Sequence, residues 1–261
     1  MRLSLFGDST LDNAIYTEDG VSIMDLVCSC LPGWEVECLA TTRSSVEWFG
    51  RDISRSGWLN FKATKAYPLK LEEEKFDRKL WESPYLAVLA MGRNDLYPLI
   101  DQLVKDEALI KSLNCAGLLS QKHINISRHD LDKLLKITWY SEVGSDLFNQ
   151  FQKFPLIYSN ALERIRVPTL VSTIITPNFN PKYKLRYDFF IGFFNQIIRE
   201  RAKHAHQRVD IIELDKIMQK SWYVNEIELN AKGTQKLAEL ICSWAKSCHG
   251  NWPDGCDRVL E

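Results

Sequence analysis

The sequence has no excess of charge of either sign. Its 33 Lys and Arg residues and 34 Asp and Glu residues give a formal net charge of −1, and neither sign dominates a long stretch. Nucleic-acid binding by phosphate neutralisation and polybasic anchoring at a membrane both need a local surplus of positive charge. We therefore expect no nucleic-acid partner.

Long apolar runs are also absent from the sequence. None approaches the roughly 18–20 residues that cross a bilayer, and the first residues show no apolar stretch ahead of a cleavage site. We expect a cytoplasmic protein with no membrane span.

The cysteine pattern lacks the features of a disulfide framework. The 7 cysteines are odd in number and scattered, and no C-x-x-C occurs, which favours reduced thiols in a reducing compartment. Cys248, His249 and Cys256 lie near one another in sequence, but a fourth metal ligand is not evident and Cys is often a small core hydrophobe. We expect no metal and no cofactor.

What is present is typical of a globular enzyme-sized domain. Hydrophobic residues make up 45% and charged residues 26% of the chain, as in ordinary globular proteins. The 261 residues fit one domain spanning 1–261. A chain of this length buries roughly 70–75% of its unfolded surface, so the core needs no disulfide to hold it.

Short apolar runs alternate with amphipathic stretches along the chain. The pattern predicts five strands, at 2–6, 35–40, 85–91, 168–174 and 209–214. It predicts helices at 21–31, 45–54, 95–112, 127–138, 141–165, 186–205 and 231–247. Such alternation is typical of parallel strands with crossover helices, which predicts an α/β doubly wound sheet of about five strands.

The connection after the third predicted strand is much longer than usual. Residues 96–140 are therefore predicted to form a helical insert near the edge of the sheet where ligands bind. Such an insert fits a lid over the site and fits extra helical packing equally well.

Polar residues follow the first strand at the point where ligands bind in such sheets. Gly7, Asp8 and Ser9 form a Gly turn followed by a hydroxyl at the expected start of a helical stretch. Alone this signal is weak, because Ser and Asp are also common N-caps. Asp12 is expected to cap the first helix, with hydrogen bonding beneath the site as the alternative.

Two further blocks lie at the same edge. Gly92-Arg93-Asn94-Asp95 follows the third strand, where a Gly allows close approach of the backbone and an amide can donate to an oxyanion. Residues 225–233, from Asn225 to Gly233, open the last predicted helix.

Together the three blocks resemble those of the SGNH/GDSL hydrolase family, in the same order and across nearly the whole chain. Gly7-Asp8-Ser9 matches the family's nucleophile block, Gly92-x-Asn94-Asp95 its G-x-N-D block and 225–233 its D-x-x-H block. The resemblance implies a flavodoxin-like three-layer α/β/α sandwich and hydrolysis of acyl esters. Ser9 would be the nucleophile and an oxyanion donor, together with Asn94 and Gly92.

The sequence departs from the family pattern at two blocks. Asn225 and Glu228 stand where the family has Asp and His. In the second block, Arg43 stands at about the position where the family has Gly. The chain looks closest to a bacterial branch that writes N-x-I-E in the last block and GDS-x-x-DN at the start. That branch has LPxGW before the second strand. Residues 31–34 match this motif with one residue fewer.

Without the histidine, the sequence leaves several candidates for the group that accepts the proton of Ser9. The reference pKa of Glu is near 4.3 and that of His near 6.5. The proton affinity of Glu228 is therefore lower than that of a histidine in its place by at most about 3 kcal/mol. Burial can raise the pKa of a carboxyl group by that much. If Arg43 reaches Glu228, the carboxylate stays ionised and the site becomes a polar anchor. His123 and His129, in the insert, are the histidines that could fold back over Ser9.

The leading hypothesis is a serine hydrolase that acts on a small acyl ester or acyl-modified ligand. Ser9 attacks, Glu228 is an unconventional base, and Asp8, Asp12, Arg43 and Asn225 support the site. A rival is a catalytically silent pseudoenzyme that binds a polar or anionic ligand or a protein partner. A third is a transferase, in which an insert that excludes water favours an acceptor alcohol.

Overall fold

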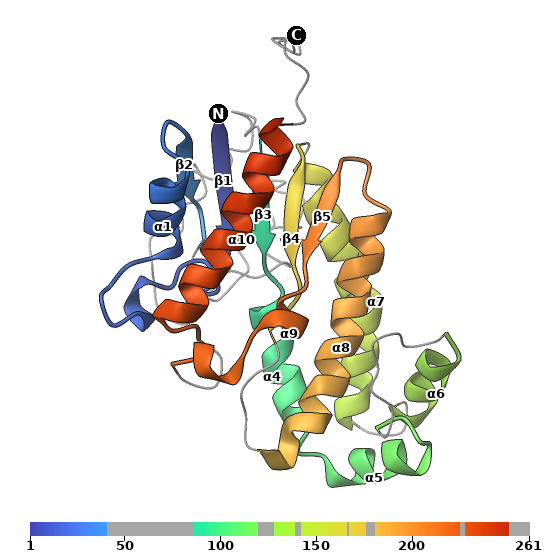
Figure 1. The fold of residues 1–261 in the computed structure, drawn as a ribbon. Coiled ribbons are helices and arrows are strands. Elements are labelled where there is room, and N and C mark those ends of the chain that lie inside the picture. The colour runs from blue at the N-terminus through green and yellow to red at the C-terminus, as the bar shows by residue number, and fades with distance from the viewer. Residues whose placement is uncertain are drawn as a thin grey trace, which may run out of the picture.

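A computed structural model describes residues 1–40, 86–119, 128–138, 142–165, 167–175, 181–224 and 228–250. Its centre is a five-stranded sheet with the order β2-β1-β3-β4-β5 (Figure 1). The strands are β1 Arg2–Gly7, β2 Glu35–Cys38, β3 Leu86–Ala90, β4 Thr169–Ser172 and β5 Val209–Ile212. Every pairing is parallel, so all five strands end at the same edge of the sheet.

Alternating side chains on the central strands feed two separate hydrophobic cores. In β3, Leu86 and Val88 belong to one cluster, whereas Ala87 and Leu89 belong to the other. Successive residues of a strand point to opposite faces, and a sheet buried on both faces reads as a continuous apolar run. This is why β3 is buried along its whole length.

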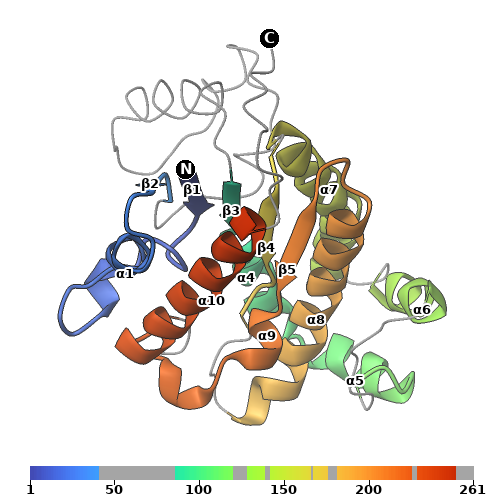
Figure 2. The same ribbon diagram turned by 45° about the horizontal axis from the view of Figure 1, so that its top comes forward.

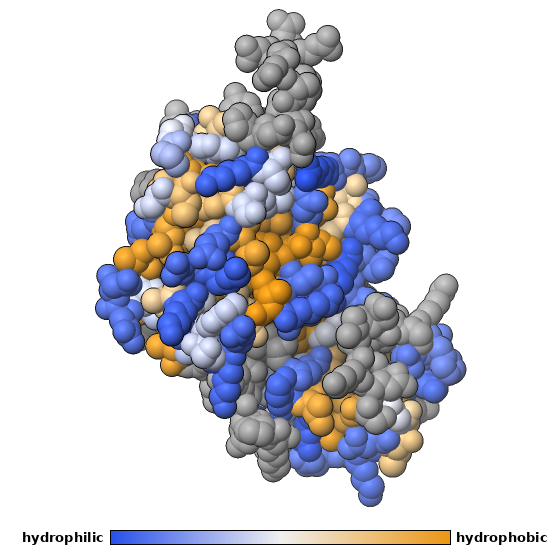
Figure 3. Space-filling view, in the orientation of Figure 1, coloured by the Kyte–Doolittle hydropathy of each residue, from blue (hydrophilic) through white to orange (hydrophobic). Residues whose placement is uncertain are grey.

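One face of the sheet is covered by α1 Ile23–Cys30 and α10 Ala231–Gly250, which contact each other (Figure 1). The buried side of α10 recurs every three to four residues, as an amphipathic helix requires. Its outer side carries exposed residues such as Lys232, Gln235 and Glu239. Hydrophilic side chains accordingly dominate this side of the molecule, with hydrophobic ones in a strip near the middle (Figure 3).

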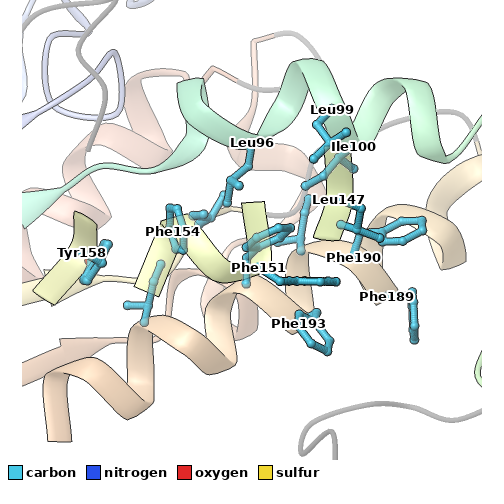
Figure 4. Packing of buried hydrophobic residues seen from close by; sticks show 14 of the residues in the cluster. Leu96, Leu99, Ile100, Leu147, Phe151, Phe154, Tyr158, Phe189, Phe190 and Phe193 are labelled. Carbon is cyan, nitrogen blue, oxygen red and sulfur yellow. The ribbon is translucent and has the colours of Figure 1, made fainter. Parts of the chain in front are cut away.

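The opposite face is covered by α4 Arg93–Leu103, α7 Glu142–Arg164 and α8 Pro181–Lys203. Phenylalanine rings from α7 and α8 interlock between these helices (Figure 4). The rings of Phe154 and Phe194 meet edge to face, with centroids 5.4 Å apart, an arrangement that aromatic quadrupoles favour. The aromatic run of 187–194 therefore builds core.

The described residues after β3 are largely helical. The insert predicted at 96–140, with its possible role as a lid, stays a prediction. The single helix predicted at 95–112 is in fact two, α4 and α5 Glu107–Cys115, because Asp106 caps a new helix by accepting from the Leu109 N–H at 3.0 Å. The helix α6 Arg128–Thr138 follows. In both ribbon views α5 and α6 lie on the side of the molecule away from α1 (Figures 1 and 2).

Three short elements complete the described chain: η1 Ala14–Tyr16, α9 Leu214–Ile217 and η3 Lys220–Trp222. The predicted flavodoxin-like α/β/α sandwich with five parallel strands is confirmed, and each predicted strand agrees with the observed one within two residues. The helix predicted at 45–54 lies outside the described residues. Within those residues, no helix is both long enough and apolar enough to cross a bilayer.

Candidate active site

Ser9 lies in a tight loop directly after β1. The Asp8 side chain organises this loop, because its Oδ1 accepts from the N–H and the hydroxyl of Thr10 at 2.8 and 2.7 Å. The N–H groups of Leu11 and Asp12 both donate to the Asp8 carbonyl at 3.0 Å. Ser9 is thereby fixed at the edge of the sheet with 2% of its surface exposed.

The helical stretch expected to begin at Ser9 is not there. The first α-helix begins at Ile23, where Ser22 and Asp25 form a capping box. The expectation that Asp12 caps the first helix was therefore wrong. Ser22 had the stronger signal, because an acidic residue follows it at the third position of the helix.

Two glycines allow the loop ends to approach each other. A Cβ at Gly7 would lie 2.9 Å from the Ala90 carbonyl oxygen, so only Gly lets β1 end so close to β3. Gly92 has a φ of 114°, a conformation that other residues rarely adopt. This turn begins α4 and directs the side chain of Arg93 toward Ser9.

Glu228 is held by a loop that folds against η3. The Val224 N–H donates to the Glu228 carbonyl at 2.9 Å. Asn230 braces the same loop, because its side-chain amide donates to the Ser221 carbonyl at 2.8 Å and its Oδ1 accepts from the Gly233 N–H at 3.1 Å. These bonds position Glu228, which is 5% exposed.

Ser9, Arg93 and Glu228 form one hydrogen-bonded cluster. The Ser9 hydroxyl donates to Glu228 Oε1 at 3.1 Å. Arg93 Nη2 donates to Ser9 Oγ, and it reaches Glu228 Oε1 and Oε2 at 3.0 and 3.3 Å. Asp8 Oδ1 lies 3.9 Å from the same nitrogen. The loops after β1 and β3 and the turn before α10 thus converge on one buried point.

Two carboxylates and one guanidinium share this buried space. Burial raises the pKa of Glu228, and the positive charge of Arg93 offsets part of that rise. Burial opposes the charge on Arg93, but Asp8 and Glu228 outweigh it and raise the pKa of the guanidinium. Asp8 Oδ2 is buried and receives no hydrogen bond within the described part of the chain.

Three tyrosines lie close enough to the cluster for its charges to affect their pKa values. Burial raises the pKa of Tyr16, Tyr97 and Tyr223, and Arg93 lowers each in part. The Tyr97 hydroxyl donates to the Ile175 carbonyl at 2.5 Å. All three therefore stay protonated at neutral pH and act as neutral neighbours of the cluster.

Asn13 connects the Ser9 loop to both helices of the α1 and α10 layer. Its Oδ1 accepts from the Ile23 N–H at 3.1 Å, and its Nδ2 donates to the Thr234 hydroxyl at 2.6 Å. Asn13 is fully buried. Ser9 and Glu228 are therefore tied to the same scaffold.

Comparison with solved structures addresses the fold. The chain is similar to the lipase Lip_vut3 from a goat rumen metagenome, with a TM-score of 0.53 and 12% identity over 93% of this chain and 96% of that one. At this identity the likeness shows the fold alone, which is the α/β/α sandwich with five parallel strands described above. No protein-family model matches the chain, and no curated protein matches it in sequence.

Two further solved structures are less similar to this chain. One is the acetylxylan esterase Axe2 of Geobacillus stearothermophilus, with a TM-score of 0.45 and 10% identity over 93% of this chain and 92% of that one. The other is a lipolytic G-D-S-L family protein of Veillonella parvula, with a TM-score of 0.42 and 11% identity over 97% and 100%.

Only some of the other predicted site residues lie in the described part of the structure. Gly92 and Asn94 lie at the start of α4, next to Arg93. His129 is exposed on α6, which packs against α5 and α7. Arg43, Asn225 and His123 lie outside the described residues. No group of three or more His, Cys, Asp and Glu side chains suited to a metal ion occurs in the described ranges.

Arg93 is the site residue that the sequence analysis missed. It was read as the variable position of G-x-N-D, and the cation expected beside Glu228 was sought at Arg43. Local sequence patterns do not mark this position, because the contacts of Arg93 depend on the geometry of the turn at Gly92. Arg93 is 3% exposed, and an arginine is almost never buried unless it is paired.

Proposed function

We propose that this chain is a serine hydrolase of the SGNH/GDSL type that acts on a small acyl ester or acyl-modified ligand, with Ser9 as nucleophile. The observation that carries the proposal is the buried hydrogen bond from the Ser9 hydroxyl to Glu228 Oε1, 3.1 Å long. A serine hydroxyl is a weak nucleophile until a neighbouring base accepts its proton. Glu228 is in position to accept it.

The pKa of the base decides how well the transfer works. A carboxylate with its ordinary pKa is a poor base for a hydroxyl, and a catalytic base works best with a pKa near the operating pH. Burial raises the pKa of Glu228 against the opposing charge of Arg93. Glu228 is therefore a stronger base than an exposed glutamate while still being able to ionise.

Arg93 takes a different part in the proposed reaction. A guanidinium cannot give up its proton in a protein and has no acceptor atom, so Arg93 is not the base. It donates to Ser9 Oγ, which stabilises negative charge on that oxygen as the proton leaves. The oxyanion of the tetrahedral intermediate would be held by Asn94 and the backbone N–H groups of Ser9 and Gly92.

The same contacts favour a second candidate, a pseudoenzyme that binds a ligand without turnover. Arg93 pairs with both carboxylate oxygens of Glu228, and this pairing stabilises the ionised, weakly basic form. A Ser9 oxygen that already accepts from Arg93 is also less available for attack. In this alternative the cluster is a polar anchor for a polar ligand or a protein partner.

Covalent trapping of Ser9 distinguishes the two. We expect a fluorophosphonate probe to label the wild-type protein and short p-nitrophenyl esters to be hydrolysed. Labelling and turnover should be lost in Ser9→Ala. Glu228→Gln should reduce turnover by a factor on the order of 10²–10⁴, while Glu239→Gln, which changes an exposed residue of α10, should leave it unchanged.

One result would reject the hydrolase, and another would reject only its proposed base. Absence of labelling and of ester turnover in a folded wild-type protein would leave the pseudoenzyme. Turnover that depends on Ser9 but survives Glu228→Gln would reject Glu228 as the base and direct attention to His123 and His129. The proposal includes a cytoplasmic location, which the six unpaired thiols of the described chain support.

A further inference from the structure

The helices α1 and α10 lie side by side along one face of the sheet, and they start from a common point. Asn13 binds the N–H of Ile23 at the start of α1 and the hydroxyl of Thr234 in the first turn of α10. Both helices then run away from the Ser9 edge of the sheet (Figure 1). Positions at equal distances along the two helices therefore face each other.

A cysteine occurs at nearly the same distance along each helix. Cys30 lies seven residues after Ile23, and Cys242 lies eight residues after Thr234. An α-helix rises 1.5 Å per residue, so each cysteine lies about 10–12 Å from the end held by Asn13. The two sulfur atoms are therefore at the same depth in the helix pair.

Helical spacing turns both cysteines toward the interface. Cys30 follows the buried residues Ile23 and Val27 at positions i+7 and i+3, so it shares their face. Cys242 follows Ala238 by four residues, in the buried stripe of α10 that packs against α1. Cys30 lies close enough to Cys242 to contribute to the raised pKa of the Cys242 thiol.

The two cysteines differ in access to solvent. Cys30 is exposed, whereas Cys242 is 3% exposed. Burial, together with the neighbouring Cys30, raises the pKa of Cys242 to about 12. Thiolates, not thiols, attack oxidants, so Cys30 is the sulfur that meets an oxidant first.

We propose that Cys30 and Cys242 are a redox pair that forms a disulfide between α1 and α10 when hydrogen peroxide reaches Cys30. Nothing in the proposed hydrolase chemistry uses either residue. The disulfide would fix the helix pair at a second point, remote from the contact that Asn13 makes at the Ser9 end.

The reaction balances in two steps. The Cys30 thiolate attacks one oxygen of hydrogen peroxide, the O–O bond breaks, and Cys30 sulfenic acid and hydroxide form; the hydroxide takes up the proton that the Cys30 thiol had released and becomes water. The Cys242 sulfur then attacks the Cys30 sulfur, the S–O bond breaks, and the Cys242 proton leaves with the hydroxyl as a second water. Each peroxide is reduced to two waters as two thiols are oxidised to one disulfide.

The test uses the purified full-length chain, treated with hydrogen peroxide and then denatured and alkylated. Mass spectrometry of a non-reduced digest should find one peptide pair joined through Cys30 and Cys242, lighter by two hydrogens than the separate peptides. The midpoint of thermal unfolding should rise by on the order of 5–10 °C, because a cross-link over a long loop restricts the unfolded chain. Dithiothreitol should reverse both changes.

Matched variants make the outcome decisive. Cys30→Ser should abolish the linked pair and the rise in the midpoint, and as an exposed position it should leave folding intact. Cys115→Ser, also exposed but on α5, should change neither. Linkage of Cys28 to either partner, or sulfinic acid on Cys30 with Cys242 still open to alkylation after denaturation, would overturn the proposal.

Discussion

Two buried clusters of this protein are built on opposite principles. Between α7 and α8, Phe151, Phe154 and Phe194 pack ring against ring at centroid distances of 5.2–5.4 Å. At the edge of the sheet, Ser9, Arg93 and Glu228 are almost as deeply buried but are joined by charge and hydrogen bonds. Burial stabilises the first cluster directly, whereas in the second it must be offset by pairing.

The aromatic cluster contributes to stability, whereas the cluster of Ser9, Arg93 and Glu228 forms the candidate active site. An aromatic ring in the first cluster contributes by filling space, so its loss leaves a cavity. A charged group in the second contributes only while its partner is present. Substitutions in the two clusters should therefore differ in their dependence on pH and on a second substitution.

The largest loss of stability is expected from the aromatic cluster. Phe190→Ala removes a fully buried ring of α8 and should lower the free energy of unfolding by about 3–5 kcal/mol at any pH. Leu185→Ala, on the same helix but 70% exposed, is the control and should change it by less than about 0.5 kcal/mol. Urea unfolding followed by circular dichroism measures both. Equal losses would show that α8 is not packed as described.

Next in size is the loss of the shared cation. Arg93→Met should lower the free energy of unfolding by about 3 kcal/mol, because it leaves Asp8 and Glu228 buried without their partner. Adding Glu228→Gln should restore part of this loss, since one of the two uncompensated charges is then removed. If the double variant were no more stable than Arg93→Met, the Arg93 to Glu228 pair would not be the relevant contact.

The same contrast explains what could be predicted from sequence. Strands and cores follow from local periodicity, which is why 85–91 anticipated β3 Leu86–Ala90. Ser9 and Glu228 were found because short motifs mark strand ends. Arg93 and Asn230 were missed, because their contacts depend on loop geometry that local patterns do not encode. The periodicity of 95–112 does not predict the break between α4 and α5, because it places the N-cap residue Asp106 inside one helix.

A smaller effect is expected at the junction of the two helices. Asn13→Ala removes the acceptor of the Ile23 N–H and the donor to Thr234, and should lower the free energy of unfolding by about 1–3 kcal/mol. Asn114→Ala, at an exposed position of α5, is the matched control. Hydrogen exchange should show faster opening at the starts of α1 and α10, and uniform opening of the whole chain would contradict this local role.

The smallest effect concerns the pH dependence contributed by Glu228. Because its pKa is raised in the folded state, the protonated form favours folding. That contribution is complete below the ordinary pKa of Glu, near 4.3, and is lost as pH rises through the folded-state pKa. The wild type should therefore lose stability relative to Glu228→Gln as the pH rises from about 4 through the raised folded-state pKa. A difference that runs the other way would mean that Arg93 outweighs burial.

The hydrogen bond between Ser9 and Glu228 joins residues 219 positions apart, and the one between Asn13 and Thr234 spans 221. During synthesis, the first strand and its serine leave the ribosome long before the last helix does. A nascent chain can thus build the β1 loop, but it holds no assembled site until the segment from Glu228 to Thr234 has emerged. Whatever this site does to its ligand, the cell meets that reactivity only after the segment from Glu228 to Thr234 has been translated.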